Sequence, residues 1–191
     1  MKIPEALQNQ LEFYGNVMDD SQELLERLQR DIQWNQREIQ MFGKVHLEPR
    51  KVAWHGDSNA RYIYSGIENH PEKWTPELIR VKTNIETIAG TTFNSVLLNL
   101  YRDGNDSMGY HSDDEPELGQ EPIIASLSLG AERKFNLKNK DSGELISLLL
   151  PHNSLLVMKG RIQDEWKHAI PKTKRDIGPR INLTFRKILH R

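Results

Sequence analysis

The sequence of 191 residues contains no cysteine. This absence excludes disulfide bonds, thiolate nucleophiles, zinc fingers and cysteine-bound iron–sulfur clusters, so any metal site must use His, Asp or Glu. Apolar runs long enough to span a bilayer are also missing, and the start, Met1-Lys2-Ile3-Pro4, has no secretory pattern. We therefore expect a soluble protein of the cytoplasm, or of the nucleus in a eukaryote, without a membrane partner.

The formal net charge is only -1, which argues against a highly basic nucleic-acid-binding tail. That total hides a segregation of charge. Asp103 to Glu121 contains seven acidic residues and no Lys or Arg, whereas Lys159 to Arg191 contains ten basic residues against three acidic ones. Opposed local functions can therefore coexist with a total near zero.

Two helices are predicted before Gly90. Asp20-Ser21-Gln22-Glu23 has the form of an N-cap with a capping-box acid, and apolar residues follow at helical spacing. Thr75-Pro76-Glu77 repeats this start with proline at the first helical position, and Gly90 ends the apolar pattern. We expect the apolar faces of both helices to pack on a sheet.

Short β-type runs follow Gly90 and predict a jelly roll. They are Phe93 to Tyr101, Pro122 to Leu129, Arg133 to Leu137, Leu145 to Leu150, Ser154 to Met158 and Arg180 to Ile188. Further strands are expected around Ile39 to His46 and Tyr62 to Tyr64. The predicted class is α+β, in one domain over residues 1–191, with helices and a lid in about 1–90 and the jelly-roll core in about 91–191.

The run from Arg180 to Arg186 alternates polar and apolar residues. Because successive side chains of a strand point to opposite faces, Arg180, Asn182, Thr184 and Arg186 should share one row. Two guanidiniums with an amide and a hydroxyl between them suit a carboxylate ligand, although a solvated face is the alternative. Asn99 and Tyr101 show a weaker alternation of the same kind, and the two strands could supply one polar pocket.

His111 and Asp113 stand two residues apart, hence on one side of an extended segment. His168 lies far downstream at an expected strand end, just before the strand that carries the two arginines. Two His and one carboxylate leave several positions open on an ion, which is the arrangement of non-haem Fe(II) oxygenases. A His-x-Asp motif alone is common by chance, so the prediction depends on the whole combination.

These residues resemble the AlkB-type Fe(II)/2-oxoglutarate-dependent nucleic-acid dealkylases. The resemblance runs from about residue 40 to 188 and looks nearest to the branch acting on duplex DNA. Its most specific part is Arg180-Ile181-Asn182-Leu183-Thr184-Phe185-Arg186. Ser112 departs from the pattern, since Arg is common there in the nearest branch.

The resemblance implies a double-stranded β-helix and three cofactors: Fe(II), 2-oxoglutarate and dioxygen. His111, Asp113 and His168 would hold the iron, and Arg186 would pair with the distal carboxylate of 2-oxoglutarate. The site of that cosubstrate would be completed by Asn99, Tyr101, Arg180, Asn182 and Thr184. The implied activity is hydroxylation of N-alkyl groups on bases such as 1-methyladenine and 3-methylcytosine, with release of formaldehyde and succinate.

For the substrate, the resemblance implies a nucleotide-recognition hairpin over Gln40-Met41-Phe42-Gly43-Lys44. Phe42, with Met41 beside it, is the candidate wedge that fills the gap left by a flipped base. A core aromatic next to a turn glycine is the alternative for Phe42. The further expected substrate contacts are Lys44, Arg50, Lys51, Tyr62, Tyr64, Ser65, Asp114 and Glu115.

These contacts have different expected roles and different alternatives. Tyr62 and Tyr64 would stack on the flipped base, or they pack in a core. Asp114 and Glu115 would lie near a cationic alkylated base, or they are solvated loop charges. The basic residues would contact phosphate, although such residues near a hairpin are usually just exposed.

The leading prediction is a monomeric enzyme that dealkylates DNA. An RNA-preferring or single-strand-preferring dealkylase is the first alternative. A catalytically silent nucleic-acid-binding relative and a protein hydroxylase on the same fold are the others.

Overall fold

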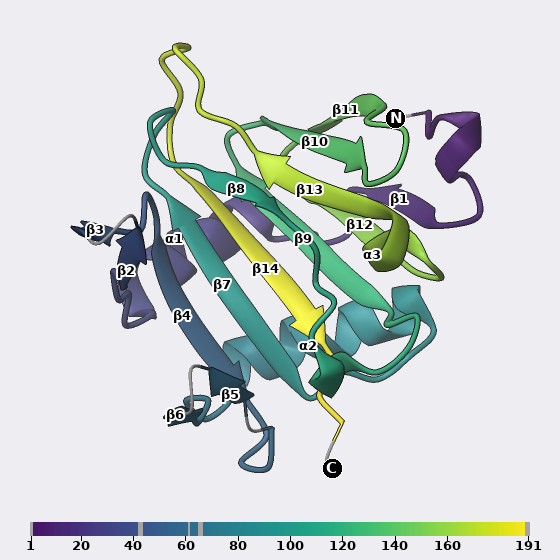
Figure 1. Cartoon of the computed structure of the whole chain (residues 1–191). Helices are drawn as coiled ribbons and strands as arrows, with labels where there is room; N and C mark the ends of the chain where they lie inside the picture. Colours follow the sequence, from purple (N-terminus) through teal and green to yellow (C-terminus); the bar gives the residue numbers. More distant parts are fainter. Residues whose placement is uncertain (1, 42–43, 61, 65–66, 190–191) are drawn as a thin grey trace.

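Two antiparallel β-sheets face each other in the computed structural model, which describes residues 2–41, 44–60, 62–64 and 67–189 (Figure 1). The six-stranded sheet has the order β1 (Leu11–Gly15), β12 (Ser154–Met158), β9 (Ile124–Gly130), β14 (Arg180–Arg186), β7 (Ser95–Tyr101) and β4 (Lys51–Gly56). The four-stranded sheet has the order β11 (Leu145–Leu150), β10 (Arg133–Asn139), β13 (Trp166–Ile170) and β8 (Met108–His111). This pair of sheets is the expected jelly roll.

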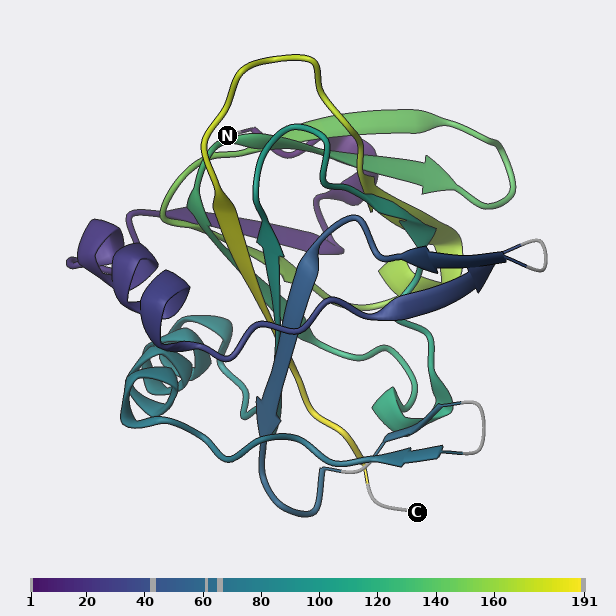
Figure 2. The ribbon, with the colours of Figure 1, turned by 90° about the vertical axis from the view of Figure 1, so that its left-hand side faces the viewer.

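Helices α1 (Ser21–Asp31) and α2 (Pro76–Ala89) cover one face of the six-stranded sheet, and the four-stranded sheet covers the other (Figure 2). Two hairpins project on the same side as the four-stranded sheet (Figure 2). They are β2 (Glu38–Met41) with β3 (Lys44–Leu47), and β5 (Tyr62–Tyr64) with β6 (Ile67–Asn69). The short helical turns are η1 (Glu5–Leu7), η2 (Pro116–Leu118) and α3 (Ile162–Glu165).

Alternating side chains of the six-stranded sheet pack in two separate hydrophobic cores. On β14, Ile181, Leu183 and Phe185 pack with the buried residues of α1 and α2. On β12, Leu156 and Met158 point the other way and join the core between the sheets. The period of two in the sequence therefore assigns each strand residue to a helix-covered face or to the inter-sheet space.

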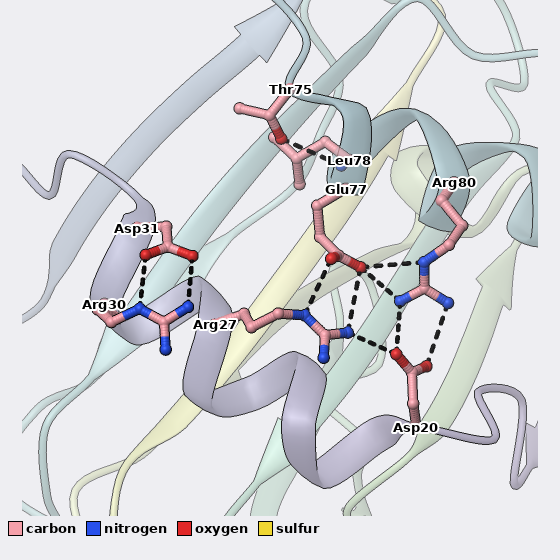
Figure 3. Close-up of polar contacts among 8 residues, drawn as sticks. All are labelled: Asp20, Arg27, Arg30, Asp31, Thr75, Glu77, Leu78 and Arg80. Atoms are coloured by element: carbon pink, nitrogen blue, oxygen red, sulfur yellow. Dashed lines mark hydrogen bonds and ion pairs between the residues drawn. The ribbon is translucent and has the colours of Figure 1, made fainter.

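Helix α2 begins and ends as its sequence predicts. Thr75 Oγ1 accepts a hydrogen bond from the Leu78 N–H at 3.2 Å (Figure 3), and Gly90 has the left-handed φ of 65° that favours glycine after a helix. Asp20 is the N-cap residue of α1 as predicted, but the predicted capping hydrogen bond is wrong, because the Asp20 side chain makes none. Arg27 and Arg80 bind that carboxylate instead, and so connect α1 to α2 (Figure 3).

The predicted strands are present, with shifts of one to two residues at some ends. The expected strand around Ile39 to His46 is a hairpin of two strands, β2 and β3. Four strands had no counterpart among the predicted runs: β1, β4, β6 and β8. β13 was expected only as a strand end at His168. β1 and β4 form the two edges of the six-stranded sheet, so the half of the chain before Gly90 contributes strands to the core sheet as well as helices. None of the helices described here is long and apolar enough to cross a membrane.

Candidate metal centre and polar cavity

The three predicted metal donors meet at the β8 edge of the four-stranded sheet. β8 and β13 are neighbours, and their pairing places His111 directly opposite His168. Asp113 follows two residues after His111, and one ligand atom from each of the three residues lies within 4.8 Å of the others. Residues more than fifty positions apart in the chain therefore form one group.

One oxygen of Asp113 is bound by the protein, and the other is free. Oδ1 accepts a hydrogen bond from Nη2 of Arg186 at 2.7 Å, while Oδ2 is buried without a hydrogen-bond partner among the described residues. Burial raises the pKa of this carboxyl, but the charges of Arg186, His168 and His111 outweigh burial and lower the pKa below its ordinary value. An ionised, buried oxygen without a partner is suited to a cation.

Both imidazoles are arranged to present a lone pair to that cation. Burial lowers the pKa of His168 to about 4, so this ring is neutral at neutral pH. Phe135 stacks on it with ring centroids 5.2 Å apart. His111 Nδ1 lies 3.0 Å from the Gly109 carbonyl oxygen, so a proton on Nδ1 leaves the Nε2 lone pair facing Asp113.

A cavity between the two sheets begins at the metal donors and extends along β14 and β7. All six residues predicted to bind the cosubstrate line this cavity together with the three donors: Asn99, Tyr101, Arg180, Asn182, Thr184 and Arg186. The polar row of β14 thus faces this cavity and not the outer surface of the sheet. Hydrogen bonds within the row, such as Thr184 Oγ1 to Asn182 Oδ1 at 2.9 Å, hold it in place.

Arg180 is the guanidinium in this cavity with the most unused donors. It is 1% exposed, and Nη2 donates to Ser128 Oγ at 2.9 Å, but Nε and Nη1 are buried without a partner among the described residues. Its guanidinium carbon lies 5.2 Å from the ring centroid of Tyr101, and burial lowers its pKa to about 10. A buried cation with unused donors is costly unless an anion binds it, so Arg180 fits a ligand carboxylate.

The prediction for Arg186 differs from this arrangement. Arg186 was expected at the distal carboxylate of 2-oxoglutarate, but its Nη2 binds the metal donor Asp113. Arg180 stands at the opposite end of the same row, six residues away along β14. The pairing of Arg186 with the distal carboxylate stays a prediction, and the unpartnered nitrogens of Arg180 make it a second candidate for that carboxylate.

The predicted substrate residues have mixed outcomes. Phe42, Gly43 and Ser65 lie outside the described residues. Four others have a known position in the hairpin strands, and their roles stay predictions: Met41, Lys44, Tyr62 and Tyr64. Arg50 is not a free phosphate contact, because it is 8% exposed and its Nε donates to Asn99 Oδ1 at 2.9 Å. Asp114 is exposed and pairs with Lys140 at 3.3 Å. Neither Asp114 nor Glu115 lines the cavity, and their role near a base stays a prediction.

Several lining residues were missed. Ser126 belongs to the cavity, and Ser128 holds Arg180. Both alternate with Leu127 and Leu129 in β9, which is the same polar alternation that identified the row on β14. Met108, Phe135 and Met158 supply apolar walls, and nothing in their local sequence separates them from ordinary core residues.

Relatives of this chain share most of its length. It is 40% identical over 181 residues to the DNA oxidative demethylase ALKBH2 of Bos taurus, covering 89% of this chain and 65% of the relative. It is 42% identical over 181 residues to the alpha-ketoglutarate-dependent dioxygenase alkB homolog 3 of Bos taurus, covering 90% of this chain and 63% of the relative. The chain thus spans slightly less than two thirds of the length of these relatives.

Solved structures share the fold at low identity. A structure described as that of OsALKBH1 superposes with a TM-score of 0.66 at 16% identity, covering 93% of this chain and 96% of that one. A prolyl hydroxylase from Trichoplax adhaerens, in complex with a peptide fragment, gives 0.64 at 11% identity, covering 95% and 84%.

The family model described as the 2OG-Fe(II) oxygenase superfamily matches residues 11–186, a range that contains every donor and every predicted cosubstrate residue. Enzymes of this superfamily use Fe(II), 2-oxoglutarate and dioxygen, and the residues of this chain fit these cofactors. The free Oδ2 of Asp113, grouped with the two imidazoles, suits the iron, and the unused nitrogens of Arg180 suit a carboxylate. The chain belongs to the 2OG-Fe(II) oxygenase superfamily.

Proposed function

We propose that this protein repairs alkylated DNA by oxidative dealkylation of bases such as 1-methyladenine and 3-methylcytosine, with release of formaldehyde and succinate. The observation that carries this proposal is the His111, Asp113 and His168 group at the end of an arginine-containing cavity. The similarity to a relative named a DNA oxidative demethylase supports the choice of substrate. We further propose a monomer located in the cytoplasm or nucleus, and the lack of cysteine suits such a reducing compartment.

In this proposal His111, Asp113 and His168 hold the metal, and Arg180 holds the distal carboxylate of 2-oxoglutarate. When bound, Fe(II) with 2-oxoglutarate and dioxygen supplies the oxidising power to hydroxylate the alkyl group on the base nitrogen. Arg186 keeps Asp113 ionised and oriented, and Phe135 holds the ring of His168. The apolar walls of Met108, Phe135 and Met158 limit the access of water to the cavity.

The test is to incubate the protein with Fe(II), 2-oxoglutarate and a duplex containing 1-methyladenine. Repaired base, formaldehyde and succinate should form in equal amounts. His111→Ala should abolish all three products, because it removes one of three metal donors. A protein that binds iron and 2-oxoglutarate but releases no formaldehyde from duplex DNA, single-stranded DNA or RNA would contradict the proposal.

We propose duplex DNA as the preferred substrate, with Phe42 as the wedge that replaces a flipped base in the stack. The support is the resemblance of residues 40–44 to the hairpin of the duplex-acting branch. Phe42→Ala should reduce activity on a methylated duplex by about tenfold or more and leave activity on a single strand nearly unchanged, because only a duplex must be unstacked and refilled. Equal losses on both substrates would count against the wedge and favour the single-strand or RNA alternative.

A further inference from the structure

Three consecutive residues after β8 are bound to distant parts of the chain. Ser112 Oγ donates to the Trp166 carbonyl oxygen at 3.0 Å. The Asp113 N–H donates to Gln163 Oε1 at 3.0 Å, and Lys140 Nζ donates to Asp114 Oδ2 at 3.3 Å. The segment that carries the carboxylate donor is therefore connected at each residue to α3, to the start of β13 or to the β10–β11 turn.

This segment needs such contacts because the strand ladder stops before it. The pairing of β8 with β13 includes His111 opposite His168, and β8 ends at His111. Asp113 is buried, and no strand hydrogen bond reaches its N–H. A buried backbone N–H requires a partner, and the side chain of Gln163 supplies it.

Gln163 is an unusual residue for this position. It is 1% exposed, and burial of an amide is unfavourable unless its groups are hydrogen-bonded. Its Oε1 binds Asp113, its Nε2 faces the Met158 sulfur at 3.6 Å, and its own carbonyl accepts from Lys140 Nζ at 2.7 Å. Lys140 therefore bridges Gln163 to Asp114, which gives a second connection between the same two segments.

We propose that Gln163 is a positioning residue of the metal centre. It stands five positions before His168 in the sequence and binds the backbone of Asp113, so it holds the carboxylate donor close to the strand that carries the distal histidine. Arg186 binds the Asp113 carboxylate, and Gln163 binds the Asp113 backbone. Without Gln163 the Asp113 N–H loses its partner, and the ion pair with Arg186 can draw the carboxylate away from the two imidazoles.

The proposal rests on the metal centre of the family and does not depend on which nucleic acid is the substrate. Partners that orient metal ligands typically change metal affinity by about 10- to 100-fold when they are removed. The appropriate variant is Gln163→Met, which keeps the length of the side chain and removes the oxygen acceptor. The matched control is Gln36→Met, since Gln36 lies outside the cavity and donates to the Glu48 carbonyl at 2.8 Å.

The experiment titrates the metal-free full chain with Mn(II) alone, and follows the absorption spectrum of Co(II) in parallel. We expect Gln163→Met to bind Mn(II) at least about tenfold more weakly and to change the Co(II) spectrum, because one donor is displaced. Gln36→Met should match the parent chain in both measurements. Thermal unfolding of each metal-free variant separates loss of folding from loss of the site.

A lower melting temperature of Gln163→Met with unchanged Mn(II) affinity and an unchanged Co(II) spectrum would overturn the proposal, because the role would then be structural only. If Gln163→Met does not fold, Ser112→Ala is the variant that tests the proposal, since it removes the hydrogen bond from Ser112 to the Trp166 carbonyl in the segment that carries Asp113. Mn(II) affinity weakened by about threefold or more in Ser112→Ala supports the proposal, and unchanged affinity overturns it. Absence of dealkylase activity in a chain that binds Mn(II) normally would contradict the proposed function and leave this inference intact.

Discussion

Arg186 donates to one oxygen of Asp113 at 2.7 Å and leaves the other oxygen buried without a partner among the described residues. One oxygen of this carboxylate therefore pairs with the guanidinium of Arg186, and the other oxygen can bind a second cation. This division explains why the group can stay ionised inside the protein before metal binds. It also means that the stability of the chain and its affinity for metal depend on the same pair of residues.

Arg186→Met should destabilise the metal-free chain by about 3 kcal/mol, because loss of one partner leaves a buried carboxylate unpaired. The loss should be smaller in saturating Mn(II), since the bound cation then replaces the missing guanidinium. Urea unfolding of the metal-free and Mn(II)-loaded forms measures both values. Arg102→Met is the control, because Arg102 is exposed and its pair with buried Asp106 lies outside the cavity. Equal losses with and without Mn(II) would contradict this account.

Arg180→Met should have the opposite effect on stability. Arg180 is a buried cation with two nitrogens unpartnered, so an apolar side chain of similar length should leave the metal-free chain equally stable or more stable. The affinity for 2-oxoglutarate, measured by calorimetric titration in Mn(II), should fall by about tenfold or more, while the affinity for Mn(II) itself stays unchanged. If Arg186→Met removed 2-oxoglutarate binding and Arg180→Met did not, the assignment of the distal carboxylate to Arg180 would be wrong.

The metal-free chain should lose stability as the pH falls from about 6.5 towards 4. The pKa of His168 is lowered from 6.5 to about 4 by burial, so between these values the unfolded chain binds a proton that the folded chain does not. Stability from this group is therefore complete above about pH 6.5 and declines below it, by on the order of 3 kcal/mol at pH 4. Urea unfolding at several pH values measures the slope.

His168→Gln is the control for that slope. It removes the titrating group and keeps a polar side chain, so the decline between pH 6.5 and 4 should become shallower. A slope that is unchanged in His168→Gln would assign the pH dependence to other residues.

Thr75 and Asp20 both stand before a helix, yet their substitution should respond differently to salt. Thr75→Ala removes the hydrogen bond to the Leu78 N–H and should cost about 1 kcal/mol at low and high salt alike. Asp20→Ala removes the ion pairs with Arg27 and Arg80 (Figure 3). Because salt screens ion pairs, the loss of stability caused by Asp20→Ala should be smaller in 1 M salt than at low salt. Thermal unfolding at two salt concentrations tests the contrast, and a salt-independent cost for Asp20→Ala would restore a capping role.

The local sequence was sufficient wherever the physical cause is local. The proline at the first position and Gly90 define helix α2, because both act through their own backbone geometry. The predicted cap by Asp20 was wrong because Arg80, sixty residues away, competes for the same carboxylate. Strand β8 was not predicted and β13 was expected only as a strand end, since these short segments become strands by pairing with each other and, for β13, with β10.

By itself the sequence determined the metal donor types, through the absence of cysteine, and the common face of Arg180 and Arg186, through the period of two in a strand. Only the tertiary structure decided which arginine faces the metal, because that depends on where the end of β14 meets the segment after β8. It also decided that Gln163 binds the Asp113 backbone, a contact between residues 50 positions apart that no local pattern encodes. Side-chain alternation is a property of one strand, whereas the partner of a buried group is set by the packing of several.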